Sequence, residues 1–146
     1  MSLGTSRRFS ANGSAAADPV QTLLRTRGCP TRIVEGGIAG LAEDWEGVVA
    51  NVTAGYKFGL DDYLNDMDVR QIIEDALALA GPSARRLASR VAAADEKLRQ
   101  LVSPAGRCLW GDALARRNRW TVEKNWWYFT RPRESAPALL ADIGAS

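Results

Sequence analysis

The sequence predicts an all-α protein, a small bundle of four or five helices followed by an extended, aromatic C-terminal arm. Three observations lead to this fold class. Apolar residues recur at steps of three and four along most of the chain, which places them on one face of successive helices. Glycine and proline stop signals separate these stretches. Only residues 126–132 and, weakly, residues 32–34 favour strands, so at most a minor two-stranded ribbon is expected.

Residues 1–18 are expected to form a disordered tail in front of a single helical domain over residues 19–146. This start of the chain is rich in Ser, Ala and Gly, contains Arg7 and Arg8, and has no acid before Asp18. It carries too little apolar surface to order itself. A short organelle transit segment is the alternative interpretation, since such segments are rich in Arg and Ser. A cytoplasmic protein is otherwise expected, because two distant cysteines suit free thiols in a reducing compartment. No apolar run is long enough to span a membrane.

Within the predicted domain, residues 19–24 suit one helical turn and residues 33–34 suit a short extended piece. The first long helix is then expected to begin at Gly36-Gly37 and to stop at Gly55, where glycine can take the left-handed conformation that ends a helix. The apolar face of this helix comprises Ile38, Leu41, Ala42, Trp45, Val48, Val49 and Val52.

Residues 60–80 are predicted to form two helices that meet at a sharp corner. The aspartate pair at 61–62 suits the first turn of a helix, where free amides and the positive end of the helix dipole favour carboxylates. Asp68 and Gln71, three residues apart, match a loose capping box and predict a second helix start. Gly81-Pro82 then ends that helix.

The next helix is expected from Ser83, as its cap, to about Val102. Its apolar residues alternate in steps of four and three, which is the seam of a helix packed lengthwise on another: Leu87, Val91, Ala94, Leu98 and Leu101. A short helix is expected around residues 109–114, and a final short helix or frayed tail at residues 137–143.

The residue inventory makes an enzyme a minority hypothesis. Histidine is absent, which removes the commonest general base and zinc ligand. Cys29 and Cys108 form no CxxC motif and are too few for a structural zinc site. Cys108 beside Arg107 is only a weak candidate for a reactive thiol. No cofactor, metal site or catalytic residue is therefore predicted.

The leading functional hypothesis is a non-enzymatic protein-binding module, such as an inhibitor, an antitoxin-like protein or an adaptor. Carboxylates gathered at the predicted corner would steer a basic protein partner, and exposed tryptophans would anchor it. The residues assigned to this surface are Asp61, Asp62, Asp66, Glu74, Asp75, Trp126 and Trp127. The simpler alternative is that these acids cap helices and face solvent. Their spacing does not fit a calcium-binding loop.

The second hypothesis is a single-stranded nucleic-acid-binding protein. Over residues 107–133 seven basic residues face two acids, and 7 − 2 gives a local charge of +5. Aromatic rings that stack on bases, next to cations that follow phosphates, are typical of such proteins. The residues assigned to this surface are Arg116, Arg117, Arg119, Trp120, Lys124, Tyr128 and Arg131. Core packing of the aromatic rings is the alternative to binding.

Because acids dominate the first half of the bundle and basic residues the second, two outcomes remain open. The two halves could neutralise each other within one molecule, or they could support self-association or pairing with a charged partner. An enzyme of unknown chemistry is the third functional hypothesis.

Overall fold

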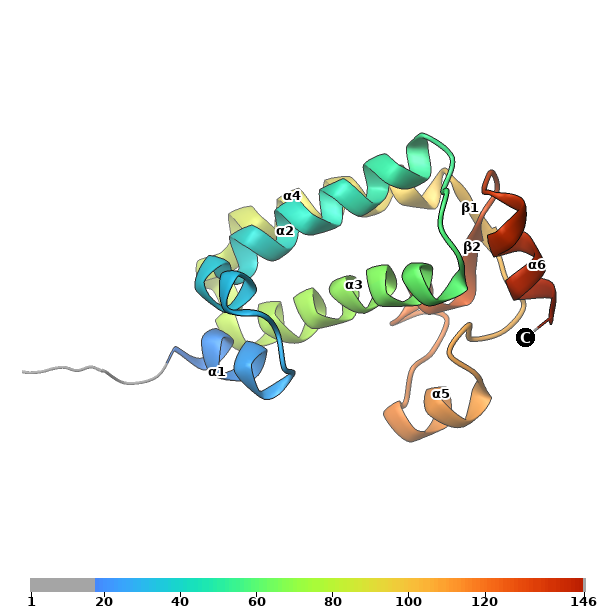
Figure 1. Ribbon diagram of the computed structural model, residues 1–146. Coiled ribbons are helices and arrows are strands. Elements are labelled where there is room, and N and C mark those ends of the chain that lie inside the picture. The colour runs from blue at the N-terminus through green and yellow to red at the C-terminus, as the bar shows by residue number, and fades with distance from the viewer. Residues whose placement is uncertain (1–17, 146) are drawn as a thin grey trace, which may run out of the picture.

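The computed structural model describes residues 18–145 of the chain (Figure 1). The expected N-terminal tail lies outside the described residues, except for Asp18, whose side chain accepts a hydrogen bond from the Val20 amide and caps the first helix. The elements in chain order are α1 (Pro19–Thr26), α2 (Thr31–Thr53), α3 (Leu60–Ala80), the 3₁₀ turn η1 (Gly81–Ala84), α4 (Arg85–Arg99), β1 (Val102–Pro104), α5 (Asp112–Asn118), the 3₁₀ turn η2 (Trp126–Phe129), β2 (Thr130–Pro132) and α6 (Pro137–Ala145). The predicted helical bundle with a minor ribbon is confirmed.

Three long helices form the body of the bundle. α2 packs against both α3 and α4, and α1 packs across α2 and α3 at one end. Figure 1 shows α2 and α4 side by side and pointing the same way. α3, which connects them in the chain, runs in the opposite direction. The ribbon and α6 lie at the opposite end from α1, and α5 stands beside α3. The short C-terminal elements therefore close one end and one side of the helical body.

α2 begins earlier than predicted, at Thr31 directly after Pro30. The expected extended piece is wrong, because Ile33 and Val34 are helical and buried. Gly37 has φ 60° and ψ −151°, a conformation that an L side chain rarely adopts, and it kinks the helix. The glycines that predicted a helix start thus mark a change of direction within a longer helical segment.

α3 is one continuous helix from Leu60 to Ala80, so the predicted sharp corner is wrong. A capping box requires the aspartate side chain to bond to a free amide of the first turn. The carboxylate of Asp68 instead accepts hydrogen bonds from Tyr128 Oη at 2.6 Å and from Trp110 Nε1 at 3.0 Å. With no glycine or proline between Leu60 and Ala80, nothing in the backbone interrupts the helix.

The predicted break between α3 and α4 is confirmed at Gly81, which takes φ 64°. The expected cap at Ser83 is wrong, because its hydroxyl donates to the Ala80 carbonyl at 2.9 Å within η1 and α4 starts two residues later. α4 ends at Arg99 rather than near Val102, because Val102 enters the first strand.

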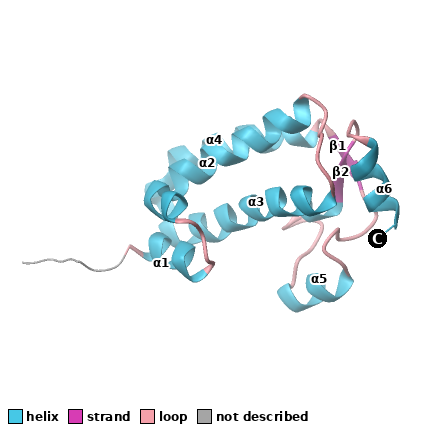
Figure 2. Cartoon of the chain, viewed as in Figure 1, coloured by secondary structure: helices cyan, strands magenta, loops and turns pink. Residues whose placement is uncertain are grey.

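The two strands form an antiparallel pair in which Val102 lies opposite Pro132 and Ser103 lies opposite Arg131 (Figure 2). The predicted ribbon exists, but its second strand is β1 and not residues 32–34. A ribbon of two strands is marginal alone, and this one lies against helices. It places the aromatic turn η2 against α3.

The core is one cluster in which every long helix takes part. Aromatic side chains fill much of it, and the largest that are fully buried are Trp45, Trp127, Tyr56, Tyr63 and Tyr128. Leu139 brings α6 into the same cluster. The C-terminal aromatic segment is therefore part of the fold's interior and not an arm laid loosely across it.

Candidate functional site

The acids assigned to protein binding all lie on α3, but most of them are held within the chain. Asp66 accepts a hydrogen bond from Tyr56 Oη at 2.6 Å, and burial raises the pKa of its carboxyl despite that bond. Asp61 and Asp62 stand exposed in the first turn of α3, where the helix dipole favours them. Asp61, Asp62 and Glu74 are exposed, as the sequence suggested for all five acids, whereas Asp66 and Asp75 are partly buried.

Glu74 and Asp75 are each paired with an arginine. Arg70 Nη1 lies 2.9 Å from Glu74 Oε1, and Arg27 Nη2 lies 2.6 Å from Asp75 Oδ2. Gln71 also donates to Asp75 at 3.2 Å. These two carboxylates, which looked unbalanced in sequence, are thus paired with Arg27, the C-cap of α1, and with Arg70 of α3 itself.

Trp126 and Trp127 are 7% and 1% exposed, so the expectation that they are surface anchors is wrong. The guanidinium carbon of Arg99 lies 4.1 Å from the ring centroid of Trp126, and that of Arg70 lies 4.5 Å from Trp127. These distances are typical of cation–π contacts, which occupy ring faces that a partner would otherwise use.

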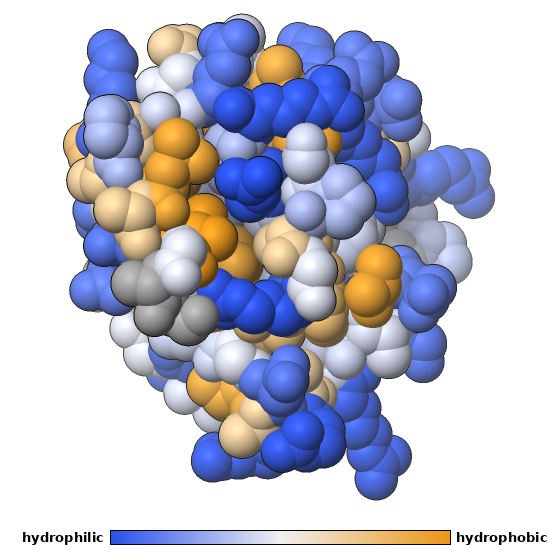
Figure 3. Space-filling model, turned by 90° about the vertical axis from the view of Figure 1, so that its right-hand side faces the viewer, coloured by the Kyte–Doolittle hydropathy of each residue, from blue (hydrophilic) through white to orange (hydrophobic). Residues whose placement is uncertain are grey.

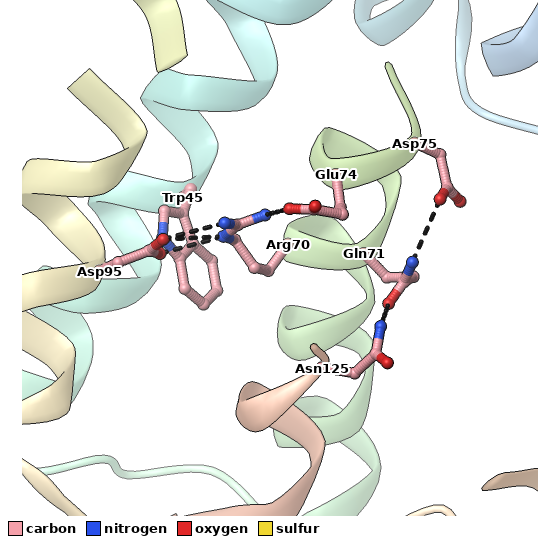
Figure 4. A network of polar contacts seen from close by, with 7 residues as sticks. All are labelled: Trp45, Arg70, Gln71, Glu74, Asp75, Asp95 and Asn125. Atoms are coloured by element: carbon pink, nitrogen blue, oxygen red, sulfur yellow. Dashed lines mark hydrogen bonds and ion pairs between the residues drawn. The ribbon is translucent and has the colours of Figure 1, made fainter. Parts of the chain in front are cut away.

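A buried polar network joins the three long helices (Figure 4). Arg70 bonds to both carboxylate oxygens of Asp95, from Nε to Oδ1 at 3.0 Å and from Nη2 to Oδ2 at 2.9 Å. Trp45 Nε1 donates to the same Oδ1 at 2.9 Å. Burial acts to lower the pKa of Arg70, but hydrogen bonds and charges from Asp95 and Glu74 outweigh it and raise that pKa. Arg70, Asp95 and the Trp45 indole all have hydrogen-bond partners within the network. We therefore assign the network to the stability of the bundle and not to ligand binding.

A surface hollow of about 510 Å³ lies between α5 and the segment that follows it. We call it the aromatic hollow, and its lining consists of Asp112, Ala115, Arg116, Arg119, Trp120, Thr121, Val122, Glu123 and Phe129. Val122 is 56% exposed, and the rings of Trp120 and Phe129 are partly exposed. Apolar surface therefore forms much of the hollow, with charged residues of both signs at its edge.

The hollow has a rigid support. Trp120 stacks on Tyr128 with a centroid separation of 4.1 Å and an interplanar angle of 28°. Tyr128 is buried, and its hydroxyl donates to Asp68 on α3 at 2.6 Å. Burial, and then this hydrogen bond, raise the pKa of Tyr128. Asn125 donates to Gln71 at 2.7 Å and accepts from the Thr121 amide. The chain on either side of the hollow is thus tied to α3.

A second, polar cleft of about 490 Å³ adjoins the aromatic hollow. The two share Arg119, Trp120 and Glu123, and the cleft adds Gln71, Glu74, Asp75, Asn118, Lys124 and Asn125. Arg119 has φ 59°, the one positive φ of a non-glycine residue in the described chain. This left-handed residue ends α5 at the boundary between the hollow and the cleft.

The residues assigned to nucleic-acid binding do not form one continuous surface. Arg116, Arg119 and Trp120 come together in the aromatic hollow, and Lys124 lines the adjoining cleft. Arg117 is exposed on α5. The buried Tyr128 supports Trp120 from within, and Arg131 lies on β2, outside the lining of both hollows. The sequence therefore singled out a segment that lines both the hollow and the cleft, but it did not show which of its rings is accessible.

The face of the molecule that carries the ribbon and α6 shows small hydrophobic areas separated by hydrophilic side chains (Figure 3). At the lower edge of that view, where Figure 1 places α5, one such area is bordered by hydrophilic residues. A separate groove of about 610 Å³ between α2 and α4 is formed largely by small and aliphatic residues, with the ion pair of Arg90 and Glu46 at its side. It contains no aromatic ring and fewer polar and charged side chains than the aromatic hollow.

Comparisons with models of protein families, with curated proteins and with solved structures gave no significant match. Within residues 18–145, no group of three or more Cys, Asp and Glu side chains could hold a metal ion. No helix in the described part of the chain is both long and apolar enough to cross a membrane. The functional argument therefore depends on the geometry of the surface.

Proposed function

We propose that the protein is a non-enzymatic protein-binding module that takes an apolar side chain of its partner into the aromatic hollow. The observation that carries the proposal is an accessible apolar surface, from Trp120, Val122 and Phe129, bordered by Arg116 and Arg119. Protein interfaces commonly have an apolar centre and a polar rim, with Trp and Arg enriched among the residues that dominate binding.

The acidic surface on α3 supports the proposal less well than the hollow does. Asp66, Glu74 and Asp75 have partners within the chain, and a partner protein would have to compete for them. Trp126 and Trp127 are buried. The proposal keeps the function predicted from the sequence and moves it to a neighbouring surface.

The mixed charge at the rim favours a protein over a nucleic acid. Asp112 and Glu123 line the same hollow as Arg116 and Arg119. A nucleic acid carries a phosphate at every step and would bring some of them close to these carboxylates. A peptide can place its charges at chosen positions, so both acids can remain solvated. Single-stranded nucleic acid remains the competing ligand because the segment also has exposed cations and a half-buried tryptophan.

The proposal is tested by selecting a random peptide library, displayed on phage, against the intact protein and against the Val122→Asp variant. Val122 is 56% exposed, so the substitution leaves the core alone but places a carboxylate in the hollow. We expect peptides selected on the intact protein to bind the variant at least about tenfold more weakly, because docking an apolar group there would bury an unpaired charge.

Leu79→Asp is the matched control. Leu79 is 52% exposed near the C-terminal end of α3 and belongs to the lining of neither the aromatic hollow nor the polar cleft. Peptides that bind all three proteins equally, or no enrichment on the intact protein, would count against the hollow as a binding site.

A further inference from the structure

Four cations on α5 and on the segment that follows it form no ion pair with any other described residue. We call Arg116, Arg117, Arg119 and Lys124 the basic collar; all four are exposed. Residues 116–124 contain one acid, Glu123, so this segment has a net charge of 4 − 1 = +3. Within this segment, Glu123 offsets only one of the four positive charges.

Three other arginines of the bundle are paired with acids of the chain. Arg27 pairs with Asp75, and Arg90 pairs with Glu46 through two hydrogen bonds of 2.6 and 2.7 Å. Arg70 pairs with Asp95 and Glu74. The collar therefore differs from these cations in having its charge available to a ligand.

The collar lies beside the apolar surface that the proposed function uses. Arg116 and Arg119 line the hollow, while Arg119 and Lys124 line the cleft next to it. A chain that places an apolar side chain in the hollow would therefore pass cations on both sides of that side chain. Opposite charge on such a chain would speed its approach and select its register.

The negative charge beside the hollow does not offer the same opportunity to a basic chain. Glu74 and Asp75 line the cleft but already face Arg70 and Arg27 at 2.9 and 2.6 Å. A basic partner would need to displace these contacts and would also meet the collar. Charge complementarity thus favours an acidic partner, the opposite of the basic partner expected from the sequence.

From this juxtaposition we propose that the partner is an acidic protein segment whose carboxylates flank the apolar residue held in the hollow. This inference depends on the proposed function, since it assigns the chemistry of the ligand at the same site. Asp112 and Glu123 at the rim limit how densely the ligand's negative charges can be spaced, which separates this ligand from a polyanion.

The test uses the phage-selected peptides themselves and two variants matched in charge. The collar variant is Arg116→Gln/Arg117→Gln/Lys124→Gln, and the control is Arg25→Gln/Arg85→Gln/Arg86→Gln, which removes three exposed arginines from α1 and α4. Circular dichroism spectra of both variants, compared with that of the intact protein, check that they are folded. We expect an excess of Asp and Glu beside an apolar residue in the selected peptides.

We further expect the collar variant to bind these peptides about tenfold more weakly at low salt, with little change in the control. Added salt should reduce the difference between the two variants, since exposed charges are screened.

Three other outcomes would overturn the acidic partner, the proposed function or both. Peptides that lose binding to Val122→Asp but show no acidic excess and no dependence on the collar would overturn the acidic partner and leave the proposed function standing. Peptides that ignore Val122→Asp would overturn both. A fluorescein-labelled oligo-dT that binds more tightly than any selected peptide, and depends on the collar, would instead assign the site to nucleic acid.

Discussion

Replacing Arg70 with methionine removes the cation that joins α3 to α4 in the centre of the bundle. The Arg70 side chain is 9% exposed and that of its partner Asp95 is 14% exposed. Methionine keeps most of the length and the apolar stem of arginine, but it cannot donate to a carboxylate. Asp95 is then left with one donor, Trp45 Nε1 at 2.9 Å.

The expected cost follows from the geometry of the pair. Three hydrogen bonds of 3.0, 3.2 and 2.9 Å join Arg70 to Asp95, and a fourth of 2.9 Å joins it to Glu74. Removing one partner of a buried ion pair typically costs about 3–5 kcal/mol, because the other charge stays buried. The slight exposure of Asp95 favours the lower end, about 3 kcal/mol, which is a large part of the roughly 5–15 kcal/mol that holds a domain folded.

Urea unfolding, followed by circular dichroism and tryptophan fluorescence, measures this change. The double variant Arg70→Met/Asp95→Leu should recover much of the lost stability, since no buried charge remains and only the Trp45 donor, worth about 1–3 kcal/mol, is unpaired. Arg90→Met, which breaks an exposed pair, should cost much less than Arg70→Met. A loss below about 1 kcal/mol for Arg70→Met, or a double variant less stable than the single one, would refute the interpretation of the network as a buried, interdependent unit.

Three further predictions concern single side chains. Because burial raises the pKa of Asp66 in the folded state, that carboxyl binds protons more readily folded than unfolded, and its contribution to stability grows as pH falls through the raised pKa. Asp66→Asn should remove this component. In parallel urea titrations the wild type should therefore gain stability relative to the variant as the pH falls towards the ordinary aspartate pKa, and a constant difference would contradict this. Asp68→Ala should cost about 2–4 kcal/mol, because it leaves the Tyr128 and Trp110 donors without their acceptor, and it should speed hydrogen exchange in residues 106–130 more than in α2. Arg119→Gly should raise the thermal midpoint of unfolding, because a φ of 59° costs glycine up to about 1 kcal/mol less than it costs arginine. An unchanged or lower midpoint would show that this backbone is not strained.

The helices of this protein could be predicted where local signals agree with one another. The spacing of three and four along α2, and Gly81-Pro82 at the end of α3, identified real features because periodicity and stop signals act within a few residues. Local signals failed where distant residues use the same side chains. Asp68 looked like a cap and instead binds Tyr128, 60 positions along the chain.

The sequence contains a signal for the polar network. Asp95 lies between Ala94 and Leu98 on the buried face of α4, and Arg70 is three residues from Met67 and from Ile73, both buried on α3. Charged side chains at such positions need an opposite charge inside the fold. That requirement predicts an ion pair within the bundle, but its partners depend on how the helices pack against one another.

The candidate site could likewise be predicted from the sequence only in part. The sequence drew attention to residues 107–133 through their charge and aromatic content, and the aromatic hollow lies within this segment. It could not distinguish the half-buried Trp120 from the buried Trp126 and Trp127, because all three occur in aromatic and basic surroundings. Accessibility depends on the stacking of Trp120 on Tyr128 and on η2 packing against α3, both of which are tertiary contacts.

The most direct test of the proposed binding site is a two-dimensional NMR titration of the isotopically labelled protein with a peptide selected on it. Binding in the aromatic hollow predicts that the largest shifts occur at the Trp120 indole, the Val122 amide and the amides of α5, with no comparable shifts around Leu79. The largest shifts in the groove between α2 and α4, at Val49 or Ala93, with an unperturbed Trp120 would contradict the account.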